Sequence, residues 1–151
     1  MDELRELYQQ VILDHNKSPR NFGKLERANR RQEGFNPLCG DHLHVYLRVD
    51  DDDVIEDIRF EGAGCAISKA SASLMTAAVK GRSAAEAEAI FSRFQALVTS
   101  DVDAPVDQAQ VGKLAVFAGV REFPMRVKCA TLAWHTMRSA LDQQAVPTTT
   151  E

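Results

Sequence analysis

The stretch from His42 to Glu61 constrains the fold of this chain more than any other part of the sequence. From His42 to Val49 polar and apolar residues alternate strictly, which is the pattern of a β-strand with one buried face. Four aspartates, Asp50–Asp53, interrupt the pattern, and Val54–Glu61 is typical of a second strand. Two strands joined by a short polar turn indicate an antiparallel hairpin, so we expect a sheet with one covered face.

Helical patterns stand on both sides of this hairpin. An apolar repeat predicts a helix over Asp2–Asp14, and Ser68 is the expected cap of a second helix that reaches about Val79. The Ser83–Glu86 capping box begins a third helix, and Gly112–Gly119 is a short helix that ends at Gly119. Pro124 lies in the first turn of the last helix. The order of helix, strands and then helices lacks strand–helix alternation. It predicts an α+β fold, a small antiparallel sheet with helices packed on one face. We expect one domain over residues 1–142 and a disordered tail over 143–151.

Composition excludes several classes of protein. The chain has 151 residues, of which 44% are hydrophobic and 26% are charged, as in soluble globular proteins. Its net charge of −4 gives no reason to expect nucleic-acid binding. No apolar run approaches the roughly 18 residues that a membrane span needs, and the acidic start MDELRELYQQ is unlike a signal peptide. We therefore expect a cytoplasmic protein without a membrane partner.

The three cysteines, Cys39, Cys65 and Cys129, are the residues with the clearest chemical potential. An odd count argues against a disulfide scaffold, so the thiols are separate core residues, metal ligands or nucleophiles. Cys39 lies in a predicted turn, Cys65 in a glycine-rich loop before a helix, and Cys129 near a helix start. Core-filling cysteines usually lie inside helices or strands, so this placement favours chemistry at the thiols.

Asp41 strengthens the case for a metal. By alternation, Cys39 and Asp41 face the same side as Leu43, which is the buried side of the strand. An inward carboxylate is costly unless it is paired or binds a cation, although Asp41 could instead cap a turn. Three thiolates and one carboxylate would suit a tetrahedral zinc site. Simple alternation points Cys65 away, so a glycine bulge would be needed to bring it in. His42 and His44 face outward and are not expected to bind this zinc ion.

Four segments in chain order are LYQQVILDHNKSPRNFG, NPLCGD, GAGCAISKASASLM and RVKCATLAWHTM. Together they closely resemble the IscU/NifU N-terminal family of iron–sulfur cluster assembly proteins, over about residues 7–141. The resemblance implies that Cys39, Asp41, Cys65 and Cys129 form one metal site, at one end of the sheet.

Three departures resemble the zinc-dependent SufU branch of that family. Lys128 stands where scaffold-type IscU has a histidine, EFPMRVK replaces the chaperone-binding motif Leu-Pro-Pro-Val-Lys, and Val98–Val120 lengthens the interval between Cys65 and Cys129. The resemblance implies a sulfurtransferase that takes persulfide sulfur from a SufS-like cysteine desulfurase and passes it to a SufB-like scaffold. Cys39, in its turn, is the expected acceptor. Arg126 and Lys128 are candidates to support the site, by pairing with Asp41 or steering the anionic persulfide, or are simply exposed.

Two other functions use the same residues. The first is a scaffold that assembles an iron–sulfur cluster on the same four ligands. The second is a structural zinc module that binds a partner, although an aspartate ligand is unusual in closed structural sites. Removal of the metal should unfold a structural module, whereas a transfer protein with an independent core should keep much of its fold.

Overall fold

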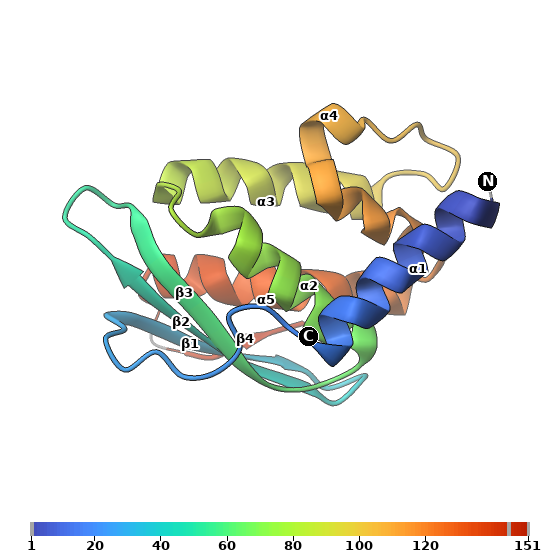
Figure 1. The fold of residues 1–151 in the computed structure, drawn as a ribbon. Coiled ribbons are helices and arrows are strands. Elements are labelled where there is room, and N and C mark those ends of the chain that lie inside the picture. Colours follow the sequence, from blue (N-terminus) through green and yellow to red (C-terminus); the bar gives the residue numbers. More distant parts are fainter. Residues whose placement is uncertain (1, 145, 151) are drawn as a thin grey trace.

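We describe the chain from a computed structural model that covers residues 2–144 and 146–150, with side chains from residue 5 in the first helix. Its helices lie on one face of a sheet, which confirms the predicted α+β fold (Figure 1). In chain order the elements are α1 (Asp2–Lys17), β1 (Arg30–Asn36), β2 (Asp41–Val49), β3 (Ile55–Ala63), α2 (Ala66–Val79), α3 (Ala84–Thr99), α4 (Gln108–Val111), the 3-10 helix η1 (Gly112–Glu122), α5 (Pro124–Leu141) and β4 (Thr148–Thr149).

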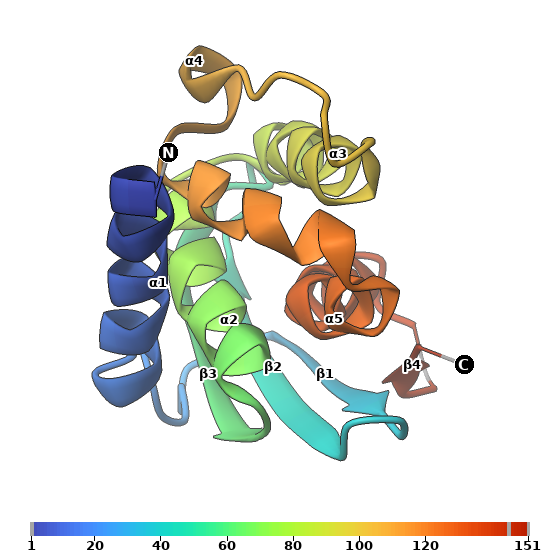
Figure 2. The ribbon, with the colours of Figure 1, turned by 90° about the vertical axis from the view of Figure 1, so that its right-hand side faces the viewer.

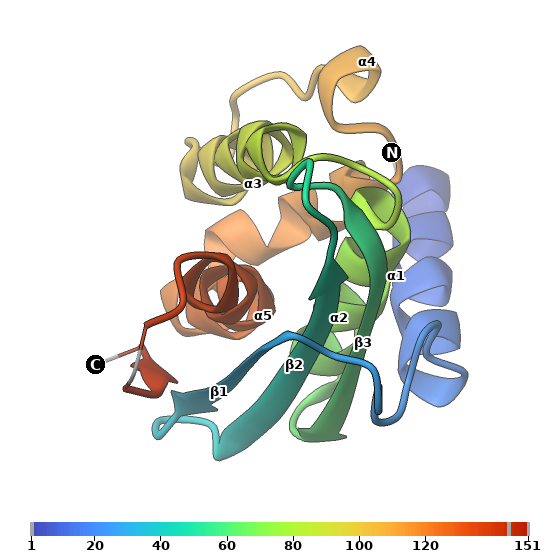
Figure 3. The ribbon, with the colours of Figure 1, turned by 90° about the vertical axis from the view of Figure 1, so that its left-hand side faces the viewer.

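The sheet has the strand order β3-β2-β1-β4 among the described residues. The pairs β1–β2 and β2–β3 are antiparallel, whereas β4 joins β1 in parallel. The segment that links α1 to β1 runs beside the other edge, where Phe60 in β3 exchanges backbone hydrogen bonds with Asn21 and Gly23 (Figure 3). The β3 edge is therefore partly covered, and the edge strand on the other side, β4, has only two residues, so both edges offer little for pairing with other chains.

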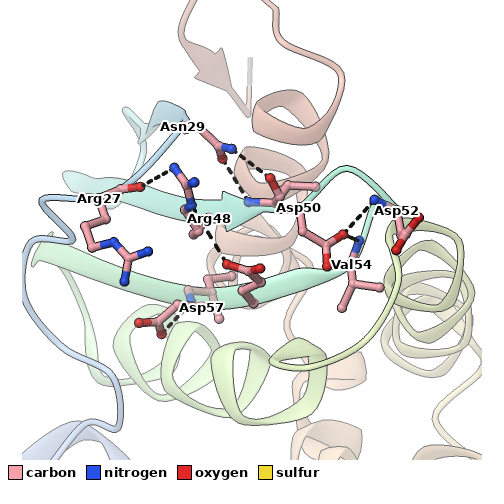
Figure 4. Close-up of polar contacts among 10 residues, drawn as sticks. Arg27, Asn29, Arg48, Asp50, Asp52, Val54 and Asp57 are labelled. Atoms are coloured by element: carbon pink, nitrogen blue, oxygen red, sulfur yellow. Dashed lines mark hydrogen bonds and ion pairs between the residues drawn. The ribbon is translucent and has the colours of Figure 1, made fainter.

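The predicted hairpin is present as β2 and β3, and polar side chains fix its turn. The Asp50 carboxylate accepts hydrogen bonds from the backbone N–H groups of Asp52 and Val54, at 2.8 and 2.9 Å (Figure 4). The Asn29 side chain donates to the carbonyl of Val49 and accepts from its N–H, at 2.7 and 2.8 Å. These contacts hold the far end of β2, so the inward or outward direction of each side chain along the strand is well defined.

The core lies between the sheet and the helices. α2 and α5 pack against the sheet, and α1, α3 and η1 lie around them (Figure 2). Trp134 in α5 is fully buried and stacks on Phe94 with ring centroids 4.9 Å apart, and Phe117 of η1 meets Phe94 edge-on. The segment inserted between Cys65 and Cys129 therefore contributes to the core. None of the described helices is long and apolar enough to cross a membrane.

The structure differs from the predictions made from the sequence at four places. Strand β1 was not predicted. The helix expected to begin at Ser68 begins at Ala66, with Cys65 as its cap. The helix expected to close at Gly119 continues as η1 to Glu122. The tail expected to be disordered contributes β4 at Thr148–Thr149, while residues 145 and 151 lie outside the described residues.

Candidate metal centre

The four predicted ligands come from one end of the sheet. Cys39 lies in the turn between β1 and β2, and Asp41 is the first residue of β2. Cys65 caps the N-terminus of α2, and Cys129 lies in the second turn of α5. The β1–β2 turn and the starts of α2 and α5 lie toward the same end of the molecule, on the right in Figure 1. Segments 90 residues apart in the chain thus meet at one point.

Three of the four ligand atoms are already clustered. The Sγ atoms of Cys39 and Cys129 are 3.2 Å apart, and one carboxylate oxygen of Asp41 lies within 4.8 Å of both. Cys65 adjoins this group, because its backbone N–H donates to Asp41 Oδ1 at 2.8 Å. Its thiol accepts a 3.5 Å hydrogen bond from the N–H of Ser68 instead. The structure therefore assembles Cys39, Asp41 and Cys129 and places Cys65 beside them.

Cys65 approaches by a route other than the expected glycine bulge. The pairing of β2 with β3 has a register shift between Arg48 and Val49, at the far end, and is regular from there to Ala63, opposite His42. Gly62 has a φ of +137°, and a Cβ there would strike the His42 carbonyl. The chain then leaves the sheet at Gly64, and Cys65 takes up the cap position of α2. The change of direction comes from the strand end and the helix cap.

The burial of Asp41 is the best evidence that a cation belongs here. Asp41 is 2% exposed, so its carboxylate has almost no contact with solvent. Among the described residues it makes no ion pair, and its recorded hydrogen bonds come from Cys65 and Asn36. A buried carboxylate with no cationic partner is unfavourable. Together with three thiols, which suit zinc or an iron–sulfur cluster, this environment fits a soft or borderline metal.

Asn36 is a site residue that sequence reasoning missed. It is fully buried, and its Nδ2 donates to Asp41 Oδ2 at 3.2 Å and to Cys129 Sγ at 3.3 Å. Its Oδ1 accepts a hydrogen bond of 3.0 Å from the Thr150 hydroxyl. The amide therefore joins two ligands from different elements. Its only sequence signal was its position at the start of NPLCGD.

The surroundings of the site raise the pKa values of two of its residues, Cys129 and Arg126. Burial raises the pKa of the Cys129 thiol, and the hydrogen bond to Cys39 and the charges of Cys65 and Asp41 raise it further. The pKa of Arg126 is raised by the negative charge of Cys65 and by contact with Cys129, so this guanidinium lies beside the thiols. Lys128 is exposed, and its amine makes no hydrogen bond or ion pair with another described residue. Arg126 is therefore a cation next to the site.

An apolar rim flanks the thiols on the surface. Leu38, next to Cys39, is 59% exposed, and Phe123 and Met125, at the start of α5, are 57% and 55% exposed. Cys39 itself is partly exposed, in contrast to the buried Cys129. Large apolar side chains with this much exposed surface around a reactive group are typical of an interaction surface.

The fold and the donor set define a class of small α+β proteins that hold a metal or cluster between a strand end and two helix starts. Residues 7–141 match the NifU-like N-terminal domain family, and the chain belongs to it. Its curated relatives carry two kinds of name at equal similarity. The iron–sulfur cluster assembly scaffold protein IscU of Streptococcus pyogenes is 40% identical over 96% of this chain and 89% of the relative. The zinc-dependent sulfurtransferase SufU of Bacillus subtilis is 39% identical, over 91% of each.

Solved structures agree with this assignment. A protein from Fervidobacterium islandicum, described as an iron–sulfur cluster assembly scaffold for the SUF system, is 35% identical and superimposes with a TM-score of 0.80. The superposition covers 91% of this chain and 98% of that one. The family is thus established, whereas the choice between scaffold and sulfurtransferase is not decided by similarity.

Proposed function

We propose that this protein is a zinc-dependent sulfurtransferase that accepts sulfur on Cys39 from a SufS-like cysteine desulfurase and passes it to a SufB-like scaffold. The observation that carries the proposal is the unequal placement of the clustered groups. Cys39 is partly exposed in a turn, whereas Cys129 and Asp41 are buried and tied together by Asn36. Cys65 is also partly exposed, but it caps α2, so Cys39 in its turn is the thiol best placed to reach a partner while the others stay in place. Such thiol chemistry suits the reducing cytoplasm.

Zinc would be held by Cys39, Asp41, Cys65 and Cys129. When bound, it would keep the thiols deprotonated, which matters most for Cys129 because burial raises the pKa of that thiol. Asp41 supplies the carboxylate, and Asn36 and the N–H of Cys65 orient it. Hydrogen-bonded partners of this kind typically set the direction and basicity of a ligand.

The transfer step requires only the Cys39 thiolate and the partner's persulfide. Cys39 Sγ attacks the outer sulfur of the persulfide and forms a new S–S bond, while the original S–S bond breaks and the desulfurase thiolate leaves. No net oxidation occurs, because one sulfur atom moves between two thiolates. Arg126 lies beside the thiols and would attract the anionic persulfide. The rim of Leu38, Phe123 and Met125 gives the desulfurase an apolar surface to cover.

The alternative is a scaffold that builds an iron–sulfur cluster on the same ligands. Three clustered or adjacent thiols permit it, and a relative named as a scaffold is 40% identical. Lys128 supports transfer, because an exposed lysine stands in place of the histidine expected of the scaffold type. A purely structural zinc module is supported less well, since the apolar core lies elsewhere, between the sheet and the helices.

The deciding experiment measures alanine release by the host cysteine desulfurase in the presence of zinc-loaded protein and free cysteine. We expect strong stimulation by the wild type, none by Cys39→Ala, and wild-type stimulation by Ser92→Ala, an exposed control on α3. Normal stimulation by Cys39→Ala would overturn the assignment of Cys39. Inhibition by zinc together with recovery on addition of iron would favour the scaffold.

A further inference from the structure

A second group of metal-binding side chains lies on the face of the sheet opposite the helices. His42 and His44 point outward from β2, and Glu33 of β1 is paired directly with His44 in the strand register. One nitrogen from each imidazole and one carboxylate oxygen all lie within 4.8 Å of one another. None of these residues belongs to the thiol cluster, although His42 directly follows Asp41 in the chain.

These side chains contact one another and are packed against neighbouring aromatic rings. His42 Nε2 lies 3.1 Å from Glu33 Oε2, and the two imidazole rings have centroids 5.0 Å apart. Phe35 stacks on His42 with a centroid distance of 4.3 Å, and Tyr46 stacks on His44 at 6.3 Å. The rings are thus supported on their faces, and their nitrogen atoms lie at the edges, where His42 Nε2 already meets the Glu33 carboxylate.

We propose that Glu33, His42 and His44 form a second metal site, which takes a borderline divalent transition metal ion such as Co²⁺, Ni²⁺ or Zn²⁺. Imidazole and carboxylate ligands suit these ions, whereas the thiol cluster on the other face suits softer chemistry. Three protein ligands leave further coordination positions for water, as in open zinc sites. The site differs from the thiol cluster in ligand type, in exposure and in the face of β2 that it uses.

The geometry needs only a small adjustment to accept an ion. Bonds of about 2.0–2.2 Å from metal to nitrogen or oxygen place ligand atoms roughly 3–4 Å apart. The side chains of His42 and Glu33 are 46% and 43% exposed, so they can rotate by this amount without repacking the core. A bound ion would replace the direct contact between Glu33 and His42, because both side chains would bind the ion instead.

The test uses Co²⁺ as the probe and protein loaded with a single equivalent of zinc, which fills the thiol site and leaves the second site open. Equilibrium dialysis should show one bound Co²⁺ in addition to the zinc, with weak visible d–d absorption and no intense thiolate-to-cobalt charge-transfer band. His44→Gln and Glu33→Gln should each weaken Co²⁺ binding by about tenfold or more. Glu56→Gln is the matched control, because it removes the same charge from an exposed position of β3.

Two results would overturn the proposal. The first is the absence of bound Co²⁺ beyond the zinc content, or binding accompanied by zinc release and a thiolate charge-transfer band. The second is equal Co²⁺ affinity of Glu33→Gln, His44→Gln and Glu56→Gln, which would show that binding depends on general surface charge. Far-UV circular dichroism of each variant checks that these exposed substitutions leave the fold intact. The desulfurase assay is independent of this test, because it reads Cys39.

Discussion

The side chain of Asn36 connects residues of the thiol site that come from different elements. Its amide group lies between a ligand from β2 and a ligand from α5, and its oxygen is held by Thr150 near the chain end. Cys39 and Asp41 could be identified from the sequence because cysteine and inward aspartate are chemically distinctive. Asn36 could not, since asparagine before proline is equally common in an ordinary exposed turn.

Gly64 sets the space available to the Asp41 carboxylate. A Cβ at this position would lie 2.5 Å from Asp41 Oδ1 and 3.1 Å from its Cγ. Gly64→Ala should therefore displace the carboxylate, lower the free energy of unfolding by about 1–3 kcal/mol and weaken zinc binding by about 10- to 100-fold. A competition titration with a chromophoric chelator measures the affinity, and urea unfolding measures the stability.

Gly119→Ala is the control for this prediction. A Cβ at Gly119 in η1 would meet no heavy atom within 4 Å. Its zinc affinity should equal that of the wild type. A wild-type affinity for Gly64→Ala as well would mean that the carboxylate can move aside freely, and that its position is not critical for the metal.

At the scale of elements, α2 and the thiol site share Cys65. The Cys65 thiol accepts the hydrogen bond of the N-terminal cap from Ser68, where serine, threonine, aspartate or asparagine is usual. The sequence suggested Ser68 as the cap because serine is a common cap and cysteine is not. A single thiol therefore caps the helix and also lies beside the other predicted metal ligands.

The two roles of Cys65 can be separated by substitution. In metal-free, reduced protein, Cys65→Ala should lower the free energy of unfolding by roughly 0.5–2 kcal/mol, because the cap is lost. Cys65→Ser keeps a capping oxygen and should be at least as stable as the wild type. Both should bind zinc more weakly. Urea unfolding and zinc titration of the same samples give the two quantities, and equal stability of the two variants would argue against capping by the thiol.

Strand β1 explains which parts of the fold the sequence could predict. The hairpin β2–β3 was predicted because its buried face is apolar, whereas the buried positions of β1 are Gln32, Gly34 and Asn36. A Cβ at Gly34 would collide with the Thr136 hydroxyl, so this strand needs a small residue where α5 crosses it. Its inward face thus carries no hydrophobic periodicity. The partner strand β4 was missed for a related reason, since a run of threonines pairs only because β1 is there.

At the scale of the whole molecule, the buried His15 and the partly buried His135 link stability to pH. His15 is 8% exposed and its Nδ1 lies 2.7 Å from Ser73 Oγ, so it ties α1 to α2. Burial lowers the pKa of His15, and the charge of Arg20 lowers it further. Burial also lowers the pKa of His135, followed by the charge of Arg138. Both side chains therefore favour the neutral form in the folded protein.

The unfolding free energy should accordingly fall as the pH drops below the ordinary histidine pKa of 6.5. The unfolded chain binds more protons than the folded one in this range, so acid favours unfolding, and the contribution is fully present above that pH. The double variant His15→Gln, His135→Gln should show a flatter dependence. Urea unfolding from pH 7.5 to 5 measures it. The zinc contribution is common to both proteins, so an unchanged slope would exclude these histidines as the cause.

The 3.2 Å between the sulfur atoms of Cys39 and Cys129 has a consequence for redox stability. A disulfide bond is about 2.05 Å long, so a shift of roughly 1 Å brings these two sulfurs to bonding distance if an oxidant removes two electrons. Oxidation would remove the proposed acceptor thiol and the buried Cys129 together, and the remaining Cys65 would be left to cross-link one molecule to another. A metal ion bound to all three thiols would prevent this oxidation and would thereby protect its own site against air.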